Sequence, residues 1–141
     1  MQKPEKLKHY LKCYENKDLE SISSLFSEDI TLRDWKISVS GYENALAETR
    51  KNFKNAESLS ISILNIMESE DSVSAELKIV VNNEEVLSVV DVLTFNDKGL
   101  ISSIRAYLGR EDLTYKTDLM HQAVFNKLYR YRVIYNAKTT R

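Results

Sequence analysis

Apolar side chains recur at helical spacing along the first part of the chain. Those at positions i, i+3, i+4 and i+7 are Leu7, Tyr10, Leu11 and Tyr14. Pro4 suits a first helical turn, so this pattern predicts a helix over residues 4–17 whose apolar face carries two phenols. Asp18 is a good N-cap for a second helix, which we expect to end at residues 27–29. Its inward side chains would be Leu19, Ile22, Leu25 and Phe26.

The pattern then changes to period two. Residues 30–34 alternate, and strand geometry places Ile30, Leu32 and Asp34 on one face. A carboxylate therefore follows two aliphatic side chains that point to the core. We expect Ile37 and Val39 to extend this strand. Residues 43–54 predict a third helix, with these side chains on its inward side: Ala45, Leu46, Thr49 and Phe53.

Alternation continues through residues 58–108 and predicts three or four antiparallel strands. Residues 86–95 are apolar on both faces, which is typical of a central strand. One of these faces carries Leu87, Val89, Asp91, Leu93 and Phe95, so a second acid lies among aliphatic side chains. Turns are expected at residues 82–83 and 96–99. The order of elements predicts an α+β fold, a cone in which helices pack on one face of a curved antiparallel sheet around a pocket.

The composition fits one globular domain and excludes several protein classes. The chain has 141 residues, of which 43% are hydrophobic and 29% are charged. Three Gly and one Pro exclude collagen-like and Pro/Gly-rich disordered chains, and no apolar run is long enough to span a membrane. Cys13 has no second cysteine to pair with, which favours a reducing, cytoplasmic location. Because His9 and His121 are the two histidines, we expect no metal site.

Charge is distributed unevenly along the chain. Residues 1–111 hold 14 Lys and Arg against 19 Asp and Glu, whereas residues 112–141 hold 6 against 2. This asymmetry predicts a domain over residues 1–110 and a basic, Tyr-rich helical extension over residues 111–141. The apolar stripe of that helix consists of Met120, Val124, Leu128, Tyr131 and Tyr135. It would pack on the domain or on a second protomer, or its basic and Tyr side chains would contact a nucleic-acid backbone. The sequence has no nucleic-acid motif, and we expect no such partner.

Three polar side chains lie on predicted inward faces: Tyr10, Asp34 and Asp91. Burying an unpaired carboxylate costs several kcal/mol or raises its pKa until it takes up a proton. Two buried acids on separate strands fit proton chemistry, with one acid ionised as a base and the other neutral as a hydrogen-bond donor beside a tyrosine. A structural alternative is that Asp34 caps a bend near a strand end and Asp91 bonds to the helices. The pattern leaves both interpretations open.

Several segments within residues 5–110 resemble the ketosteroid isomerase group of the SnoaL-like, or NTF2-like, superfamily. The similar segments are YLKCYENKDLESI (10–22), LFSEDITLRD (25–34), SGYE (40–43), VVDVLTFNDKGLI (89–101) and RAY (105–107). The resemblance implies an NTF2-like cone and three roles. Tyr10 matches the tyrosine of the oxyanion hole, Asp34 the base that moves a proton between carbons, and Asp91 the protonated acid that assists the tyrosine.

The sequence also departs from this group. Phe26 and Thr49 occupy the positions of further tyrosines that support the oxyanion tyrosine, and Trp35 replaces the proline after the base. We expect the side chains around a small apolar ligand to be Trp35, Phe26, Tyr14 and Phe53. The resemblance implies a homodimer and chemistry without a cofactor. Two functions stay open: an isomerase or related enolising enzyme for a small apolar carbonyl compound, and a non-catalytic module that binds a ligand, oligomerises or docks a partner.

Overall fold

Of the three helices in the described residues, the first and the third bury most of the side chains that their sequence patterns predict. The computed structural model describes residues 1–110, and the extension predicted for residues 111–141 lies outside the described residues. The helices are α1 (Lys3–Glu15), α2 (Leu19–Ser23) and α3 (Tyr42–Asn55). In α1 the buried residues are Leu7, Tyr10, Leu11 and Cys13. In α3 they are Ala45, Leu46, Thr49 and Phe53.

Six strands form one curved, unclosed sheet. They are β1 (Phe26–Arg33), β2 (Ser38–Ser40), β3 (Leu59–Glu68), β4 (Ser72–Val81), β5 (Glu85–Phe95) and β6 (Ile101–Leu108). Their spatial order is β2-β1-β6-β5-β4-β3, so β5 has a strand on each side, as its two apolar faces predict. The pairing of β1 with β6 is parallel and the other pairings are antiparallel. The sheet is therefore mixed, where the sequence predicted an antiparallel one.

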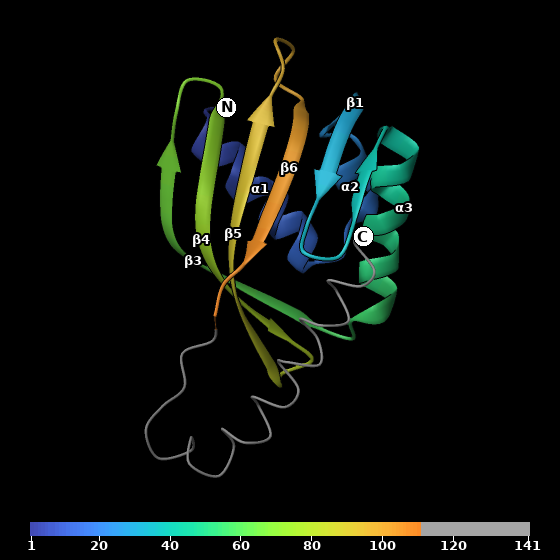
Figure 1. Ribbon diagram of the computed structural model, residues 1–141, viewed down its shortest axis with the longest axis vertical. Helices are drawn as coiled ribbons and strands as arrows, with labels where there is room; N and C mark the ends of the chain where they lie inside the picture. Colours follow the sequence, from blue (N-terminus) through green and yellow to red (C-terminus); the bar gives the residue numbers. More distant parts are fainter. Residues whose placement is uncertain (111–141) are drawn as a thin grey trace. The chain divides into compact units, whose positions relative to one another are not determined.

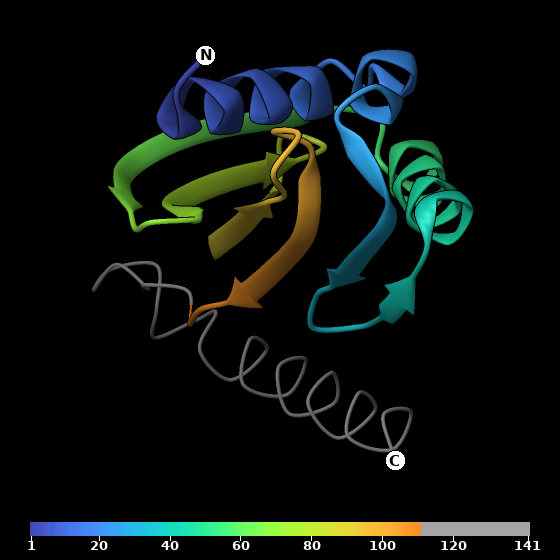
Figure 2. The same cartoon turned by 90° about the horizontal axis from the view of Figure 1, so that it is seen from above.

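The helices cover one face of this sheet, and the core lies between the two layers. Figure 1 and Figure 2 show α1 lying across the sheet, where it packs against β3 and β4, while α3 packs against β1 and β2. The largest fully buried side chains come from both layers and are Leu7, Ile22, Ile30, Leu77, Leu93 and Val73. This arrangement is the predicted α+β cone of the NTF2-like type.

The second helix is shorter than its pattern predicts. Asp18 caps α2 by accepting a hydrogen bond from the Ser21 backbone N–H at 3.1 Å, but the helix ends at Ser23. Phe26 and residues 27–29 belong to β1 instead of the helix. Pairing with β6 explains the change, because Phe26 lies beside Ile101 in the sheet. A strand remote in sequence therefore overrides the local helical spacing.

A turn divides the strand that was predicted to run through residues 30–39. Strand β1 ends at Arg33, the Asp34 N–H donates to the Ile37 carbonyl at 2.9 Å, and β2 returns antiparallel to β1. Asp34 therefore lies in the turn and not within the strand. The other turns follow the prediction: Asn82 and Asn83 adopt left-handed φ angles of 55° and 59°, and Gly99 has a φ of 77°.

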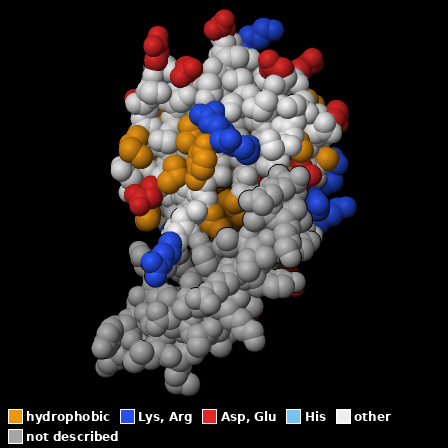
Figure 3. Space-filling view, in the orientation of Figure 1, with side chains coloured by type: hydrophobic (Ala, Val, Ile, Leu, Met, Phe, Trp, Pro, Cys, Tyr) orange, Lys and Arg blue, Asp and Glu red, His pale blue; other side chains and the backbone are white. Residues whose placement is uncertain are grey.

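The sheet face opposite α1 is not uniformly polar. Figure 3 looks onto this side and shows hydrophobic side chains gathered beside Lys and Arg side chains. The large hydrophobic side chains exposed on the described residues are Met1, Ile63, Leu64, Met67, Tyr107 and Leu108. Within residues 1–110, no helix has the length and apolar character needed to cross a membrane.

Truncation of Leu93 tests where the core lies. Leu93 is fully buried on β5, whereas Leu64 on β3 is 60% exposed. Leu93→Ala leaves a cavity and should lower the free energy of unfolding by about 2–5 kcal/mol. The matched change Leu64→Ala should alter it by no more than about 0.5 kcal/mol. Denaturant titration of both variants measures the difference, and equal losses would contradict the placement of the core.

Candidate functional site

Asp91 lies in the middle of β5, on the face covered by the helices. Its exposed fraction is 9%, and the neighbours two residues away on the same face, Val89 and Leu93, are buried. Its register partners on the adjacent strands are both alanines, Ala75 on β4 and Ala106 on β6. Small side chains on both sides leave the carboxyl group uncrowded. Burial and the nearby charge of Asp34 together raise the pKa of Asp91 to about 7.

The Asp91 carboxyl group and the Tyr10 hydroxyl have no hydrogen-bond partner among residues 1–110. No buried side-chain polar atom in this part of the chain is both unpartnered and cut off from water. The oxygens of Asp91 and Tyr10 therefore reach space that a water molecule can enter, although both residues are buried as a whole. Groups of this kind are open to a ligand atom because no bond within the described fold must break first.

Tyr10 contributes a phenol from the opposite layer, and this phenol interacts electrostatically with Asp91. It lies on the buried face of α1 and is 4% exposed. Burial raises its pKa well above the usual value, and the neighbouring Tyr14 and Asp91 add to this effect. The phenol therefore keeps its proton and remains a hydrogen-bond donor at neutral pH.

The turn after β1 fixes the orientation of Asp34. Its Oδ1 accepts hydrogen bonds from the backbone N–H groups of Lys36 at 2.7 Å and Ile37 at 2.8 Å. The structural alternative from the sequence, a cap on a bend at a strand end, therefore describes one oxygen of this residue. The other oxygen, Oδ2, makes no hydrogen bond to residues 1–110. One oxygen holds the carboxylate in place and the second is left for other chemistry.

Both acids adjoin β6. Arg33, the last residue of β1, pairs with Arg105 of β6, and Asp34 follows Arg33 in the turn. Ala106, the residue after Arg105, pairs with Asp91 of β5. The two acids therefore lie on opposite sides of the same stretch of β6, which agrees with the contribution of the Asp34 charge to the raised pKa of Asp91.

The four aromatic residues named from the sequence come together only in part. Tyr10 contacts Tyr14 and Phe26 with ring centroids 5.9 Å and 6.5 Å apart, and Tyr14 meets the edge of Phe53 at 4.8 Å. Phe26 and Phe53 are buried core residues, which leaves Tyr14 as the half-buried member of the group. Trp35 is half-buried in the β1–β2 turn and packs against the core.

Two further polar residues of α3 adjoin this region. Thr49 is buried, but its hydroxyl donates to the Ala45 carbonyl at 2.9 Å within the helix, so it adds no free polar group to the interior. Asn52 was not singled out in the sequence, and its side-chain amide donates to the Tyr14 hydroxyl at 3.1 Å. Its exposed position on a helix resembles that of any solvated asparagine, so the sequence carries no signal for this contact.

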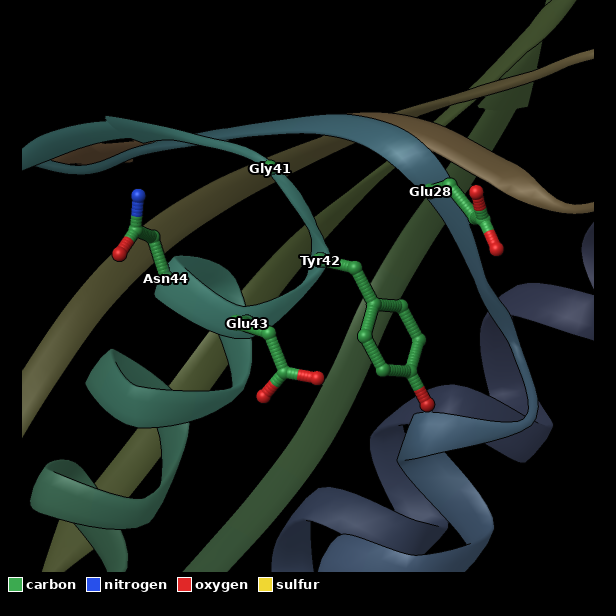
Figure 4. A pocket seen from close by; sticks show the side chains of 5 residues that line it. All are labelled: Glu28, Gly41, Tyr42, Glu43 and Asn44. Atoms are coloured by element: carbon green, nitrogen blue, oxygen red, sulfur yellow. The ribbon is translucent and has the colours of Figure 1, made fainter.

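A separate depression of about 450 Å³ lies where α3 begins. Figure 4 shows its lining residues, which are Glu28, Gly41, Tyr42, Glu43 and Asn44. The Tyr42 hydroxyl is already used, because it donates to the Ser23 carbonyl at 2.9 Å. None of Tyr10, Asp34 and Asp91 lines this depression. In residues 1–110 no group of three or more His, Cys, Asp or Glu side chains is arranged to hold a metal ion.

Comparison with solved structures finds the same fold in proteins of low sequence identity. An NTF2-like protein of unknown function from Cytophaga hutchinsonii gives a TM-score of 0.65 at 12% identity over 77% of this chain and 91% of that chain. A candidate ketosteroid isomerase from Kribbella flavida gives a TM-score of 0.66 at 14% identity, over 77% of this chain and 78% of that chain. An LEH-like epoxide hydrolase from Mycobacterium tuberculosis gives a TM-score of 0.64 at 16% identity, over 74% of this chain and 80% of that chain. A search of curated proteins finds no match.

The family model of the SnoaL-like domain matches residues 7–104. The chain belongs to this family. The SnoaL-like domain thus includes Tyr10, Asp34 and Asp91, and the resemblance noted in the sequence is confirmed at the level of family and fold. The roles of these three residues stay predictions.

The raised pKa of Asp91 predicts a pH-dependent stability. Between pH 4 and pH 7 the folded protein holds a proton on Asp91 that the unfolded chain releases, so the free energy of unfolding should fall as pH rises through this window. The expected loss between pH 5 and pH 8 is about 3 kcal/mol. Asp91→Asn should remove this pH-dependent loss of the free energy of unfolding. The control variant Asp97→Asn changes a residue in an exposed turn and should leave the loss in place. Urea titrations at both pH values measure it; an unchanged pH dependence in Asp91→Asn would contradict the burial of an ionisable group.

Proposed function

We propose that this SnoaL-like domain is a cofactor-independent isomerase or related enolising enzyme that acts on a small apolar carbonyl compound in the cone. The observation that carries the proposal is the buried Asp91 carboxyl group, which has no partner in residues 1–110 and a pKa raised to about 7. An acid that is neutral at or below neutral pH is a hydrogen-bond donor. Tyr10 supplies a second donor beside it.

The proposed reaction moves one proton between two carbons of the substrate. Asp34, through Oδ2, takes a proton from the carbon next to the carbonyl group, and the C–H electron pair moves into the enolate. Negative charge develops on the carbonyl oxygen, where Tyr10 and neutral Asp91 donate hydrogen bonds. Protonated Asp34 then returns its proton to another carbon, the double bond shifts, and the enzyme is restored. No oxidant, reductant or water is consumed.

The register of the sheet supports this division of roles. Asp34 follows β1 and Asp91 lies on β5, so the two acids approach from opposite sides of β6. That arrangement leaves room for a flat carbonyl compound, with the base at one end and the donors at the other. The rings of Tyr14 and Phe26 contact that of Tyr10, and the ring of Phe53 contacts that of Tyr14, so these side chains provide an apolar wall. The relatives of this fold include an epoxide hydrolase, so another protein of the same architecture transforms a small molecule.

One observation favours a second candidate, a cone that binds a ligand without turnover. Asp34 already caps the β1–β2 turn through Oδ1, which is a sufficient structural reason for an aspartate at this position. In that case Tyr10 and Asp91 would still hold a ligand oxygen. Measuring binding and turnover separately distinguishes the two candidates. A homodimer, a cytoplasmic location and the packing of residues 111–141 stay predictions from the sequence.

Substitution of Asp34 by Asn separates catalysis from structure. The asparagine oxygen can still accept the two backbone hydrogen bonds of the turn, but the side chain is no longer a base. Turnover of a β,γ-unsaturated ketone should fall about 10²- to 10⁴-fold, with little loss of ligand affinity. Asp97→Asn is the matched control and should leave the rate unchanged. A turnover rate in Asp34→Asn close to that of the wild type would rule out Asp34 as the base, whereas binding without turnover in the wild type would favour the second candidate.

Phenols test the two donors, because a phenol oxygen resembles the oxygen of an enolate. Removing a hydrogen bond to a partly charged oxygen should weaken binding about 10- to 100-fold. We expect this loss for Tyr10→Phe and for Asp91→Leu, and none for Tyr42→Phe, whose hydroxyl bonds to Ser23 elsewhere. Affinity should also fall as pH rises through about 7, because ionised Asp91 no longer donates. Calorimetric titration measures these affinities; no binding to the wild type at millimolar phenol would favour a module that interacts with other partners.

A further inference from the structure

Tyr14 is a second phenol that the proposed reaction does not use. It lies one helical turn after Tyr10 on α1, and the two rings are 5.9 Å apart with a tilt of 57°. Its ring packs edge-on against Phe53 of α3 at 4.8 Å, whereas the ring of Tyr10 contacts Phe26 of β1. The two phenol rings therefore pack against different elements: Tyr14 packs against α3, and Tyr10 packs against the sheet.

The hydroxyl of Tyr14 is held so that its own proton stays available. Its oxygen accepts a hydrogen bond from the Asn52 side-chain amide at 3.1 Å. A phenol has one proton to donate as well as lone pairs to accept with, and no residue in the range 1–110 accepts this proton. A hydrogen bond accepted by a hydroxyl polarises its O–H group and makes it a stronger donor. Asn52 thus orients the Tyr14 hydroxyl and makes it a stronger hydrogen-bond donor.

Tyr14 also shares the electrostatic environment of the two acids. Burial is the main cause that raises its pKa to about 12, and the charges of Asp91 and Asp34 contribute in the same direction. The hydroxyl therefore stays protonated through the whole range in which Asp91 titrates. Its ring contact with Tyr10 places Tyr14 next to the proposed donor pair.

We propose that Tyr14, oriented by Asn52, donates a hydrogen bond to a second oxygen of the ligand, distinct from the carbonyl oxygen held by Tyr10 and Asp91. This inference rests on the proposed function and narrows its substrate class. The substrate would be a carbonyl compound with a further oxygen acceptor, such as a dicarbonyl or an alkoxy- or hydroxy-carbonyl compound. Tyr14 would then select the substrate, while the proton transfer stays with Asp34.

Paired phenol probes test this role without knowledge of the substrate. A methoxy group offers an oxygen acceptor, and an ethyl group of similar size does not. The wild-type protein should bind 3-methoxyphenol or 4-methoxyphenol about 3- to 10-fold more tightly than the ethylphenol with the same substitution pattern. In Tyr14→Phe, which keeps the ring packing against Phe53, this preference should disappear.

Variants of Asn52 test the same inference from an exposed position. Asn52→Asp replaces the amide donor by an acceptor, so the Tyr14 proton should turn toward the aspartate and the methoxy preference should be lost. Tyr42→Phe is the control and should keep the preference. This inference alone would be overturned if the methoxy preference survived in Tyr14→Phe or in Asn52→Asp. It would also be overturned if the wild type showed no such preference while its phenol binding still depended on Tyr10 and Asp91. Absence of any phenol binding would overturn the proposed function as well.

Discussion

The candidate site depends on the burial of one carboxyl group in the middle of the sheet. Asp91 is 9% exposed on β5, and no residue in the described range gives its carboxyl group a hydrogen bond. Such surroundings favour the neutral acid over the carboxylate, and the charge of Asp34 favours it further. Folding thereby retains a proton at a fixed position in the cone, at a cost in stability above neutral pH. The fold does not require an acid at this position, because an aliphatic side chain would fill the same space without this loss of stability.

The mixed sheet brings the other acid into range. The parallel pairing of β1 with β6 fixes Arg33 beside Arg105, and so brings the turn that carries Asp34 to the stretch of β6 that pairs with Asp91. The turn that follows β1 holds one oxygen of Asp34 with two backbone N–H groups. Helix α1 then supplies Tyr10 and Tyr14 from the facing layer. Each polar group is positioned by a different element, so the site exists only when the helices and the sheet are assembled.

Much of this architecture could be predicted from residue patterns, and the rest depends on contacts between remote segments. The alternation of apolar and polar residues predicted the four C-terminal strands and the inward position of Asp91. Helical spacing of apolar residues predicted most of the buried faces of α1 and α3. Phe26 satisfied a helical pattern as well, but pairing with Ile101 draws it into β1. The strand predicted through Asp34 missed the turn, although the structural alternative placed a bend capped by Asp34 near a strand end. Asn52 gave no signal, because its partner Tyr14 lies on another helix.

The most direct test is an NMR titration of the Asp91 carboxyl carbon in the wild-type protein and in Asp34→Asn. The account predicts a pKa of about 7 in the wild type and a lower pKa in the variant, because the charge of Asp34 is one of the two causes of the shift. An Asp91 whose pKa lies near 3.8, the usual value for an aspartic acid, would contradict the neutral hydrogen-bond donor on which the proposed chemistry rests.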